Sequence, residues 1–341
     1  MVVRPGGFVY KPLFSCNFFL YFYNNFIHLV VNTMKIYLKW FYWYKNFWDE
    51  VILFWLLNYL QKEYNPDEIV LEVWDMERIQ NRFSKNKTYL QPGIEDKIDF
   101  VENKVISKRF RQILSFFGIN KYKKYFKVFG GWEVLDESRN FPHDWWNLVL
   151  LHHHSIRKWK FILVGWVWTS ERFRTKKLFK YMLYRAQKII CREKTSYERV
   201  SHYWKNNAVL YDDFSKEIFE SVQESKKEKN LLINISPKYF NKKNLENIKK
   251  FVEKHSSDCK KIFFPADINL DKVLFTNIRK IIPDLEIYDR TKHNLQDTID
   301  LFSTCIWWIW SRLHFLYPLK IFGKEFENIS TSDKVEKIIK N

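Results

Sequence analysis

Residues 35–73 read KIYLKWFYWYKNFWDEVILFWLLNYLQKEYNPDEIVLEV, and the order of apolar segments in this stretch decides the fold class. Two short apolar runs, at 35–39 and 68–73, have the length and composition of buried strands. The segment between them, 49–64, is long enough for a helix and begins with two acidic residues, as helices commonly do. A strand, a helix and a second strand predict a right-handed βαβ unit with parallel strands.

The same alternation continues along the chain. Further strands are expected at 124–129, 160–165, 188–191, 208–211, 231–236, 260–265 and 285–288, and further helices at 174–187, 242–255, 270–281 and 294–302. A polar, lysine-rich stretch at 220–230, ESVQESKKEKN, separates two βα arrays. We therefore expect an α/β protein with two Rossmann-like domains that face each other across a cleft, at 34–219 and at 231–341, the second with a closing helix.

The first 33 residues form a leader of a different kind. LFSCNFFLYFYNNFIHLVV at 13–31 has about the length of a membrane span, and Arg4 and Lys11 precede it. Three asparagines and a histidine weaken that interpretation, and Met34 directly precedes the first strand. We interpret 1–33 as an artefactual extension, with translation starting at Met34; a signal anchor is the alternative.

Charge and cysteine content narrow the function classes only slightly. The formal net charge is +18, but the lysines are spread along the chain with abundant Asn, Ile, Phe and Tyr, which is typical of an A/T-rich coding sequence. A basic surface still favours an anionic substrate. The four cysteines lack any metal-ligand spacing and indicate a reducing compartment. Three consecutive histidines in LHHHSIR at 151–157 would point about 100° apart on a helix, so they predict no metal site.

Tryptophan is unusually frequent and glycine unusually rare. The chain has 15 Trp and 8 Gly, whereas average usage gives about 24 glycines at this length. The tryptophans gather where turn glycines belong, at 39–50, 129–134, 163–171 and 305–310. Glycine at strand-to-helix turns permits positive φ and close backbone approach. Our hypothesis is that most of these positions are glycine in the natural protein, with UGA codons read as Trp. An authentic aromatic sugar-binding or base-stacking surface is the alternative.

Candidate functional residues follow the predicted strands, because ligands bind at the carboxyl ends of strands in such folds. Arg192 directly follows the strand at 188–191, and Ser196 lies on the first turn of the helix after it. Arg312 and His314 follow the tryptophan-rich stretch in the sequence SRLH. An arginine fork binds a phosphate or carboxylate, and a histidine can move a proton near neutral pH. An arginine paired with surface carboxylates and a solvated histidine are the ordinary alternatives.

With glycine restored, three elements resemble the polysaccharide pyruvyl transferases. They are NFWDEVIL at 46–53, CREKTS at 191–196 and WSRLH at 310–314, within a resemblance that spans 34–326. The tryptophans are the departure from the pattern. The resemblance implies a fold similar to the GT-B glycosyltransferases and phosphoenolpyruvate as the donor substrate. The carboxyvinyl unit of the donor would become a pyruvate ketal on a saccharide or lipid-linked saccharide.

The resemblance also implies roles for individual residues. Arg192 and Arg312 would hold the donor carboxylate and phosphate, and His314 would supply the proton. Ser196, Asn46 and Asp49 are weaker candidates for shaping the cleft or the acceptor site. The reaction needs no cofactor and no metal, and we expect no nucleic-acid partner. The resemblance places the protein in the cytoplasm, with peripheral association at the inner face of the membrane as an alternative.

Three other hypotheses stay open from the sequence. A GT-B-type nucleotide-sugar glycosyltransferase would need a nucleotide site in the second domain. A non-enzymatic binder of nucleic acid or another anionic polymer would use the +18 charge and would lose affinity steeply with salt. Finally, genuine tryptophans at positive-φ turns would make the chain a poorly folding relative of the enzymes.

Overall fold

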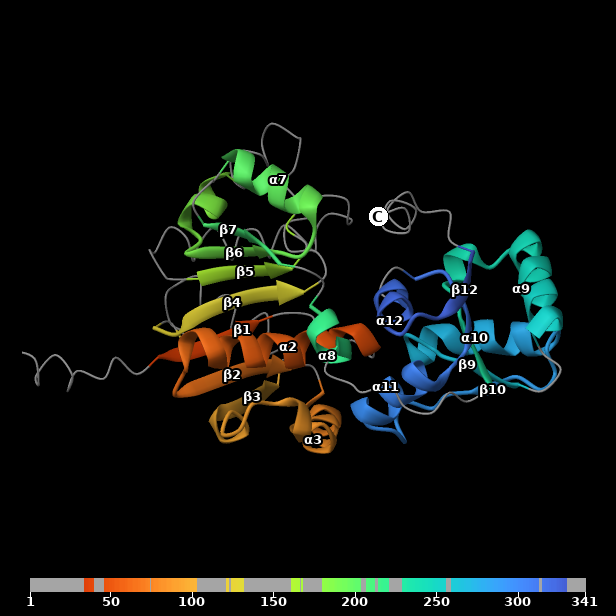
Figure 1. The fold of residues 1–341 in the computed structure, drawn as a ribbon. Helices are drawn as coiled ribbons and strands as arrows, with labels where there is room; N and C mark the ends of the chain where they lie inside the picture. Colours follow the sequence, from red (N-terminus) through yellow and green to blue (C-terminus); the bar gives the residue numbers. More distant parts are fainter. Residues whose placement is uncertain are drawn as a thin grey trace, which may run out of the picture.

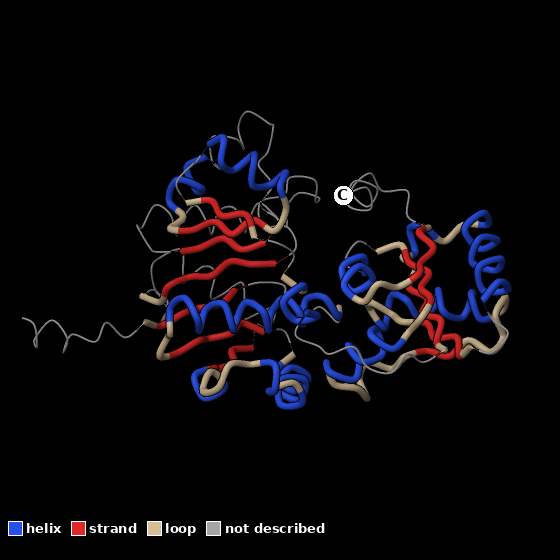
Figure 2. Tube along the Cα trace, viewed as in Figure 1, coloured by secondary structure: helices blue, strands red, loops and turns tan. Residues whose placement is uncertain are grey.

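The computed structural model describes residues 34–39, 46–73, 75–102, 121–122, 124–131, 161–165, 167, 180–203, 207–211, 214–220, 229–255, 259–312 and 315–329. These residues build two parallel β-sheets with helices packed beside them (Figure 1). Helices, strands and loops alternate along both halves of the chain (Figure 2). The structure therefore confirms the expected α/β fold class.

The first sheet has seven strands in the order β3-β2-β1-β4-β5-β6-β7, all parallel. The elements of this half are β1 (Lys35–Lys39), α2 (Phe47–Tyr64), β2 (Glu68–Val73), α3 (Met76–Lys85), β3 (Ile98–Glu102), β4 (Phe126–Gly131), β5 (Phe161–Gly165), β6 (Lys188–Cys191), α7 (Lys194–Tyr203), β7 (Ala208–Leu210) and α8 (Lys216–Glu220). Short 3₁₀ turns lie at Lys87–Tyr89 and Glu95–Lys97. The arrows of β4 and β5 point towards the second sheet in Figure 1.

The second sheet has five strands in the order β10-β9-β8-β11-β12, also all parallel. Its elements are β8 (Asn230–Asn234), a 3₁₀ turn (Pro237–Tyr239), α9 (Lys242–His255), β9 (Lys260–Phe263), α10 (Ile268–Arg279), β10 (Glu286–Ile287), α11 (Leu295–Thr304), β11 (Trp307–Trp310), α12 (Leu316–Ile321) and β12 (Glu325–Asn328). In both sheets the first strand is internal, and the chain adds strands on one side of it and then on the other. That arrangement is the doubly wound Rossmann topology.

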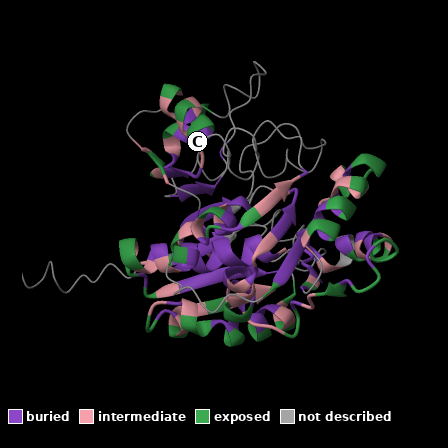
Figure 3. Ribbon diagram, turned by 45° about the vertical axis from the view of Figure 1, so that its right-hand side comes forward, coloured by how far each residue is buried: buried purple, intermediate pink, exposed green. Residues whose placement is uncertain are grey.

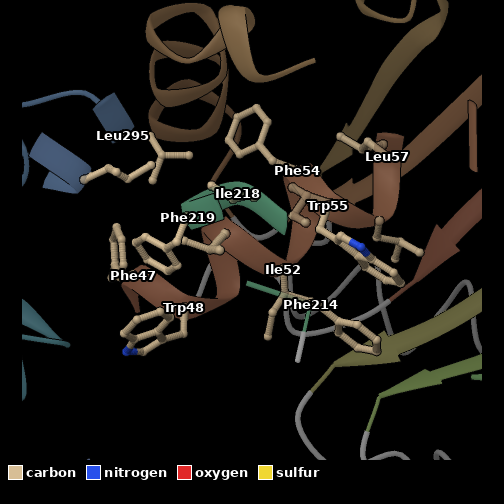
Figure 4. Packing of buried hydrophobic residues seen from close by; sticks show 14 of the residues in the cluster. Phe47, Trp48, Ile52, Phe54, Trp55, Leu57, Phe214, Ile218, Phe219 and Leu295 are labelled. Atoms are coloured by element: carbon tan, nitrogen blue, oxygen red, sulfur yellow. The ribbon is translucent and has the colours of Figure 1, made fainter. Parts of the chain in front are cut away.

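Helix α2 is the structural centre of the first half. The Asn46 side chain caps it by accepting a hydrogen bond from the Trp48 N–H. Apolar residues occur on every side of this helix, so almost all of it is buried. Around it pack Phe214, Ile218 and Phe219 from the α8 region and Leu295 from α11 (Figure 4). Figure 3 shows that the strands are mostly buried and that exposed residues are concentrated on the outer helices.

The tryptophan-rich stretch at 305–310 is not a turn. It forms strand β11, which lies between β8 and β12 and pairs with both. Aromatic side chains are favoured in strands because they fill the space on either face of the sheet. Asn65 is the one non-glycine residue with positive φ among the described residues. The expectation that Trp48, Trp308 and Trp310 stand at positive-φ turns is therefore wrong.

Candidate functional site

The two sheets each have a topological switch point, where the strand order reverses. It lies between β1 and β4 in the first sheet and between β8 and β11 in the second. Ligands of doubly wound folds bind outside the carboxyl ends of the strands at this point. Arg312 comes two residues after the end of β11, so the second switch point carries one of the arginines expected from the sequence.

Hydrogen bonds around Ser311 fix the backbone at this switch point. The Ser311 N–H donates to the Asn234 carbonyl at 3.0 Å, and the Ser236 N–H donates to Ser311 Oγ at 2.6 Å. The Asn234 side chain donates to the Phe264 carbonyl at 2.7 Å. These bonds join the carboxyl ends of β8, β9 and β11. They fix the backbone that leads into Arg312.

A buried carboxylate holds Arg312. Arg312 Nη2 donates to Asp271 Oδ1 at 2.6 Å, and the Asp271 side chain is fully buried whereas 22% of the Arg312 side chain is exposed. Burial raises the pKa of Asp271, and the positive charge of Arg312 opposes that rise. Burial also lowers the pKa of Arg312, and Asp271 opposes that change in turn. The two charges therefore support each other at the switch point.

The start of α2 reaches this edge of the second sheet. The Phe47 N–H donates to the Ala266 carbonyl at 3.2 Å, and Asn46 forms an isolated antiparallel bridge with Asp267. Ala266 and Asp267 follow β9 and precede α10. Asn46 and the first turn of α2, which contains Asp49, therefore lie beside the 266–267 segment. The backbone amides of that segment hydrogen-bond to Asp271, the partner of Arg312.

A second group of buried charges joins the two halves beside this junction. Arg82 on α3 makes a bidentate pair with Glu50 on α2, with its closest nitrogen–oxygen distance at 2.7 Å. Arg290 lies 3.7 Å from the same carboxylate and donates from Nη1 to the Ala266 carbonyl. Burial lowers the pKa of Arg290 to about 10, so it remains charged at neutral pH.

Further hydrogen bonds extend this cluster across the interface. Arg82 Nη1 also donates to the carbonyls of Arg290 and His293. The Asn86 side chain donates to Glu50 and accepts from the Leu295 N–H. Glu50 therefore lies at the centre of a buried network that fixes α2 and α3 against the 289–295 loop of the second half.

Arg192 and Ser196 lie at a different place in the first sheet. Arg192 follows β6, which is three strands from β1, and it is buried. Its backbone N–H donates to the Gly165 carbonyl at 3.3 Å. Ser196 Oγ, in the first turn of α7, donates at 3.0 Å to Glu193, which directly precedes that helix. The structure confirms a strand-end position for Arg192, whereas the hydrogen bond of Ser196 is local.

Some expected features lie outside the described residues. They are His314, the histidines at 152–154, and residues 132–134 of the FGGWEV stretch. Across the described ranges, no group of three His, Cys, Asp or Glu residues could hold a metal ion. Within those ranges, no helix is long and apolar enough to span a membrane.

Sequence reasoning missed Asp271, Glu50 as an ion-pair partner, and Arg290. One signal pointed to the first of them. PADINLD at 265–271 follows an expected strand directly and puts two aspartates four residues apart at a helix start. Residues in that position face the strand ends. Nothing local indicates the partners of Glu50, because Arg290 lies 240 residues further along the chain.

The chain resembles known proteins in its fold and not in its sequence. No family model matches the chain, and no curated protein matches it. Solved structures do. UDP-N-acetylglucosamine 2-epimerase from Methanocaldococcus jannaschii superposes with a TM-score of 0.56 at 11% identity, over 90% of this chain and 86% of that one. The chain has a GT-B-like fold.

Two further structures support the same conclusion. A putative UDP-N-acetylglucosamine 2-epimerase from Listeria monocytogenes gives a TM-score of 0.56 at 10% identity, over 90% of this chain and 82% of that one. A glycosyltransferase from Rickettsia africae gives 0.51 at 12% identity, over 89% and 81%. At these identities the likeness concerns the fold alone.

Proposed function

We propose that this protein transfers the carboxyvinyl unit of phosphoenolpyruvate to a saccharide and closes it into a pyruvate ketal. The observation that carries the proposal is the position of Arg312, which Asp271 holds at the second switch point beside the start of α2. An immobilised guanidinium at the carboxyl end of a strand suits a small donor that carries a carboxylate and a phosphate. The resemblance of the NFWDEVIL, CREKTS and WSRLH elements to pyruvyl transferases supplies the donor identity.

The chemistry assigns separate tasks to cations and to a proton donor. Protonation of the donor methylene carbon makes the neighbouring carbon electrophilic, and a sugar hydroxyl then forms a bond to that carbon. The carbon–oxygen bond to phosphate breaks, phosphate leaves, and a second hydroxyl closes the ketal. Arg312 would bind the anionic groups of the donor, with Arg192 as a second cation from the first sheet. His314 would deliver the proton.

A nucleotide-sugar reaction is the second candidate, and the fold comparison favours it. The likeness includes UDP-GlcNAc 2-epimerase from Neisseria meningitidis bound to UDP-GlcNAc, with a TM-score of 0.52 at 9% identity. In that case Arg312 would face a diphosphate instead of an enol phosphate. Either donor would place an anionic group beside Arg312, so the position of Arg312 alone does not distinguish them. Binding of each donor therefore has to be measured.

Calorimetric titration distinguishes the two donors. Phosphoenolpyruvate and UDP-GlcNAc would be titrated separately into the full chain at the same pH and ionic strength. We expect saturable binding of phosphoenolpyruvate and no measurable heat from UDP-GlcNAc beyond dilution. Saturable binding of UDP-GlcNAc without binding of phosphoenolpyruvate would reject the pyruvyl transfer proposal in favour of a nucleotide-sugar enzyme.

We also propose that Trp308 and Trp310 are glycine in the protein that the source organism makes. In β11 both indole N–H groups are buried and have no hydrogen-bond partner among the described residues. A buried, unsatisfied donor costs about 1–3 kcal/mol. Peptide mass spectrometry of the protein isolated from its source should find glycine at both positions and tryptophan at Trp159. Tryptophan at 308 and 310 would contradict the proposal.

A further inference from the structure

We infer that Asp271 is a positioning residue, which orients Arg312 for the anionic donor and ties that orientation to the contact between the two halves. The inference rests on the proposed use of Arg312 in donor binding. Asp271 was not among the residues singled out from the sequence. Its role follows from what each of its two oxygens contacts.

The two carboxylate oxygens of Asp271 serve different partners. Oδ2 accepts hydrogen bonds from the Ala266 N–H at 2.9 Å and from the Asp267 N–H at 3.1 Å. Oδ1 accepts from Arg312 Nη2 at 2.6 Å. The first set of bonds organises the loop that precedes α10. Only the bond to Oδ1 comes from Arg312, two residues beyond the end of β11, so loop stabilisation alone does not account for the pair.

The loop at 266–267, which Asp271 organises, also contacts the start of α2 in the first half of the protein. The Ala266 carbonyl accepts from the Phe47 N–H of α2 and from Arg290 Nη1. Asp267 forms the bridge with Asn46. A shift of α2 against this loop therefore acts on the two amides that hold Asp271, and through Asp271 on the guanidinium.

Arg312 retains donors for a ligand after this pairing. Asp271 uses Nη2 and the Nε–H group is buried, but 22% of the Arg312 side chain stays exposed, which leaves part of the guanidinium accessible to a ligand. A guanidinium presents its donors in a rigid fork, so fixing one nitrogen fixes the direction of the others. Removal of the Asp271 charge would leave the cation in place but free to rotate away from the donor.

A double-mutant cycle for donor affinity tests the inference. Asp271→Asn, Arg312→Ala and the double variant would be titrated with phosphoenolpyruvate by calorimetry. We expect Asp271→Asn to weaken donor binding at least about tenfold, because an Arg312 guanidinium that is no longer held in direction makes weaker contacts with the donor. The double variant should bind no more weakly than Arg312→Ala, since Asp271 acts through Arg312. Glu72→Gln, which alters a buried carboxylate bound by Tyr37 in the first sheet, should leave the affinity unchanged.

Methylguanidinium provides a readout that a purely structural role would not change. At millimolar concentration it should raise the melting temperature of Arg312→Ala and partly restore donor binding, because Asp271 can hold the added cation. The double variant should show neither effect. Equal rescue of both variants would overturn the inference. So would an Asp271→Asn variant that loses stability but binds the donor within about twofold of the wild type.

The outcome for Asp271 is separable from the outcome for the proposed function. If the wild-type protein binds UDP-GlcNAc and not phosphoenolpyruvate, the pyruvyl transfer proposal fails, and the same cycle run with UDP-GlcNAc decides the role of Asp271. If the wild-type protein binds neither donor, Arg312 has no donor to be oriented for, and the inference is overturned together with the proposed function.

Discussion

Replacement of Glu50 by Gln should lower the free energy of unfolding by about 3–5 kcal/mol, because removing one partner of a buried ion pair leaves uncompensated charge. Glu50 is the carboxylate that faces both Arg82 and Arg290, and all three side chains are at most one-tenth exposed. The substitution keeps the size of the side chain. The loss therefore reports the charge and its hydrogen bonds, and not a cavity.

Urea unfolding of the wild type and the variant measures this difference. Glu63→Gln is the matched control, because Glu63 pairs with Lys188 at 3.3 Å on the surface, where an ion pair is worth at most about 1 kcal/mol. A similar loss in both variants would contradict the central role of Glu50. We also expect the Glu50 variant to unfold in two steps, since its network joins the two halves through Arg82 and the 289–295 loop.

Replacement of Arg312 by Ala should weaken binding of phosphoenolpyruvate by about 100-fold or more. Loss of a charged group that pairs with a ligand anion typically costs about 2–5 kcal/mol, and each 1.4 kcal/mol is about tenfold in affinity. Arg312→Lys keeps the charge but loses the fork, so its affinity should lie between those of the wild type and the alanine variant.

Calorimetry on these variants needs a control for net charge. Arg279→Ala removes the same charge from the exposed end of α10, where the guanidinium lies over Phe275. Its donor affinity should equal that of the wild type. Equal weakening by Arg279→Ala and Arg312→Ala would show that the +18 charge attracts the donor without a defined site, and the assignment of Arg312 would fail.

Part of the fold was predictable because buried parallel strands read as short, continuous apolar runs. The ranges 35–39, 68–73 and 188–191 match β1, β2 and β6 for this reason. β3 and β12 lie at sheet edges and carry the polar sequences IDFVE and EFEN, so apolar runs did not reveal them. β11 was missed because its tryptophans were interpreted as replaced turn glycines.

The sequence indicated site residues only where their position beside a predicted strand, turn or helix was enough to single them out. Arg312 was singled out because it follows the tryptophan-rich stretch in the sequence SRLH, and Asn46 because it precedes an apolar helix with an acidic first turn. The pairing of Arg312 with Asp271 joins residues 41 positions apart, on two elements that become neighbours only when the sheet forms. Hydrogen-bond partners at such separations depend on packing that a single sequence does not contain.

The most direct test of the proposed function is identification of the product. The full chain would be incubated with phosphoenolpyruvate and a panel of p-nitrophenyl hexosides and N-acetylhexosaminides, followed by phosphate assay and mass spectrometry of the sugars. We expect phosphate release that requires the sugar, together with a sugar mass increased by one pyruvic acid less one water. Unchanged phosphoenolpyruvate and sugars, with UDP-GlcNAc consumed in a parallel reaction, would contradict pyruvyl transfer.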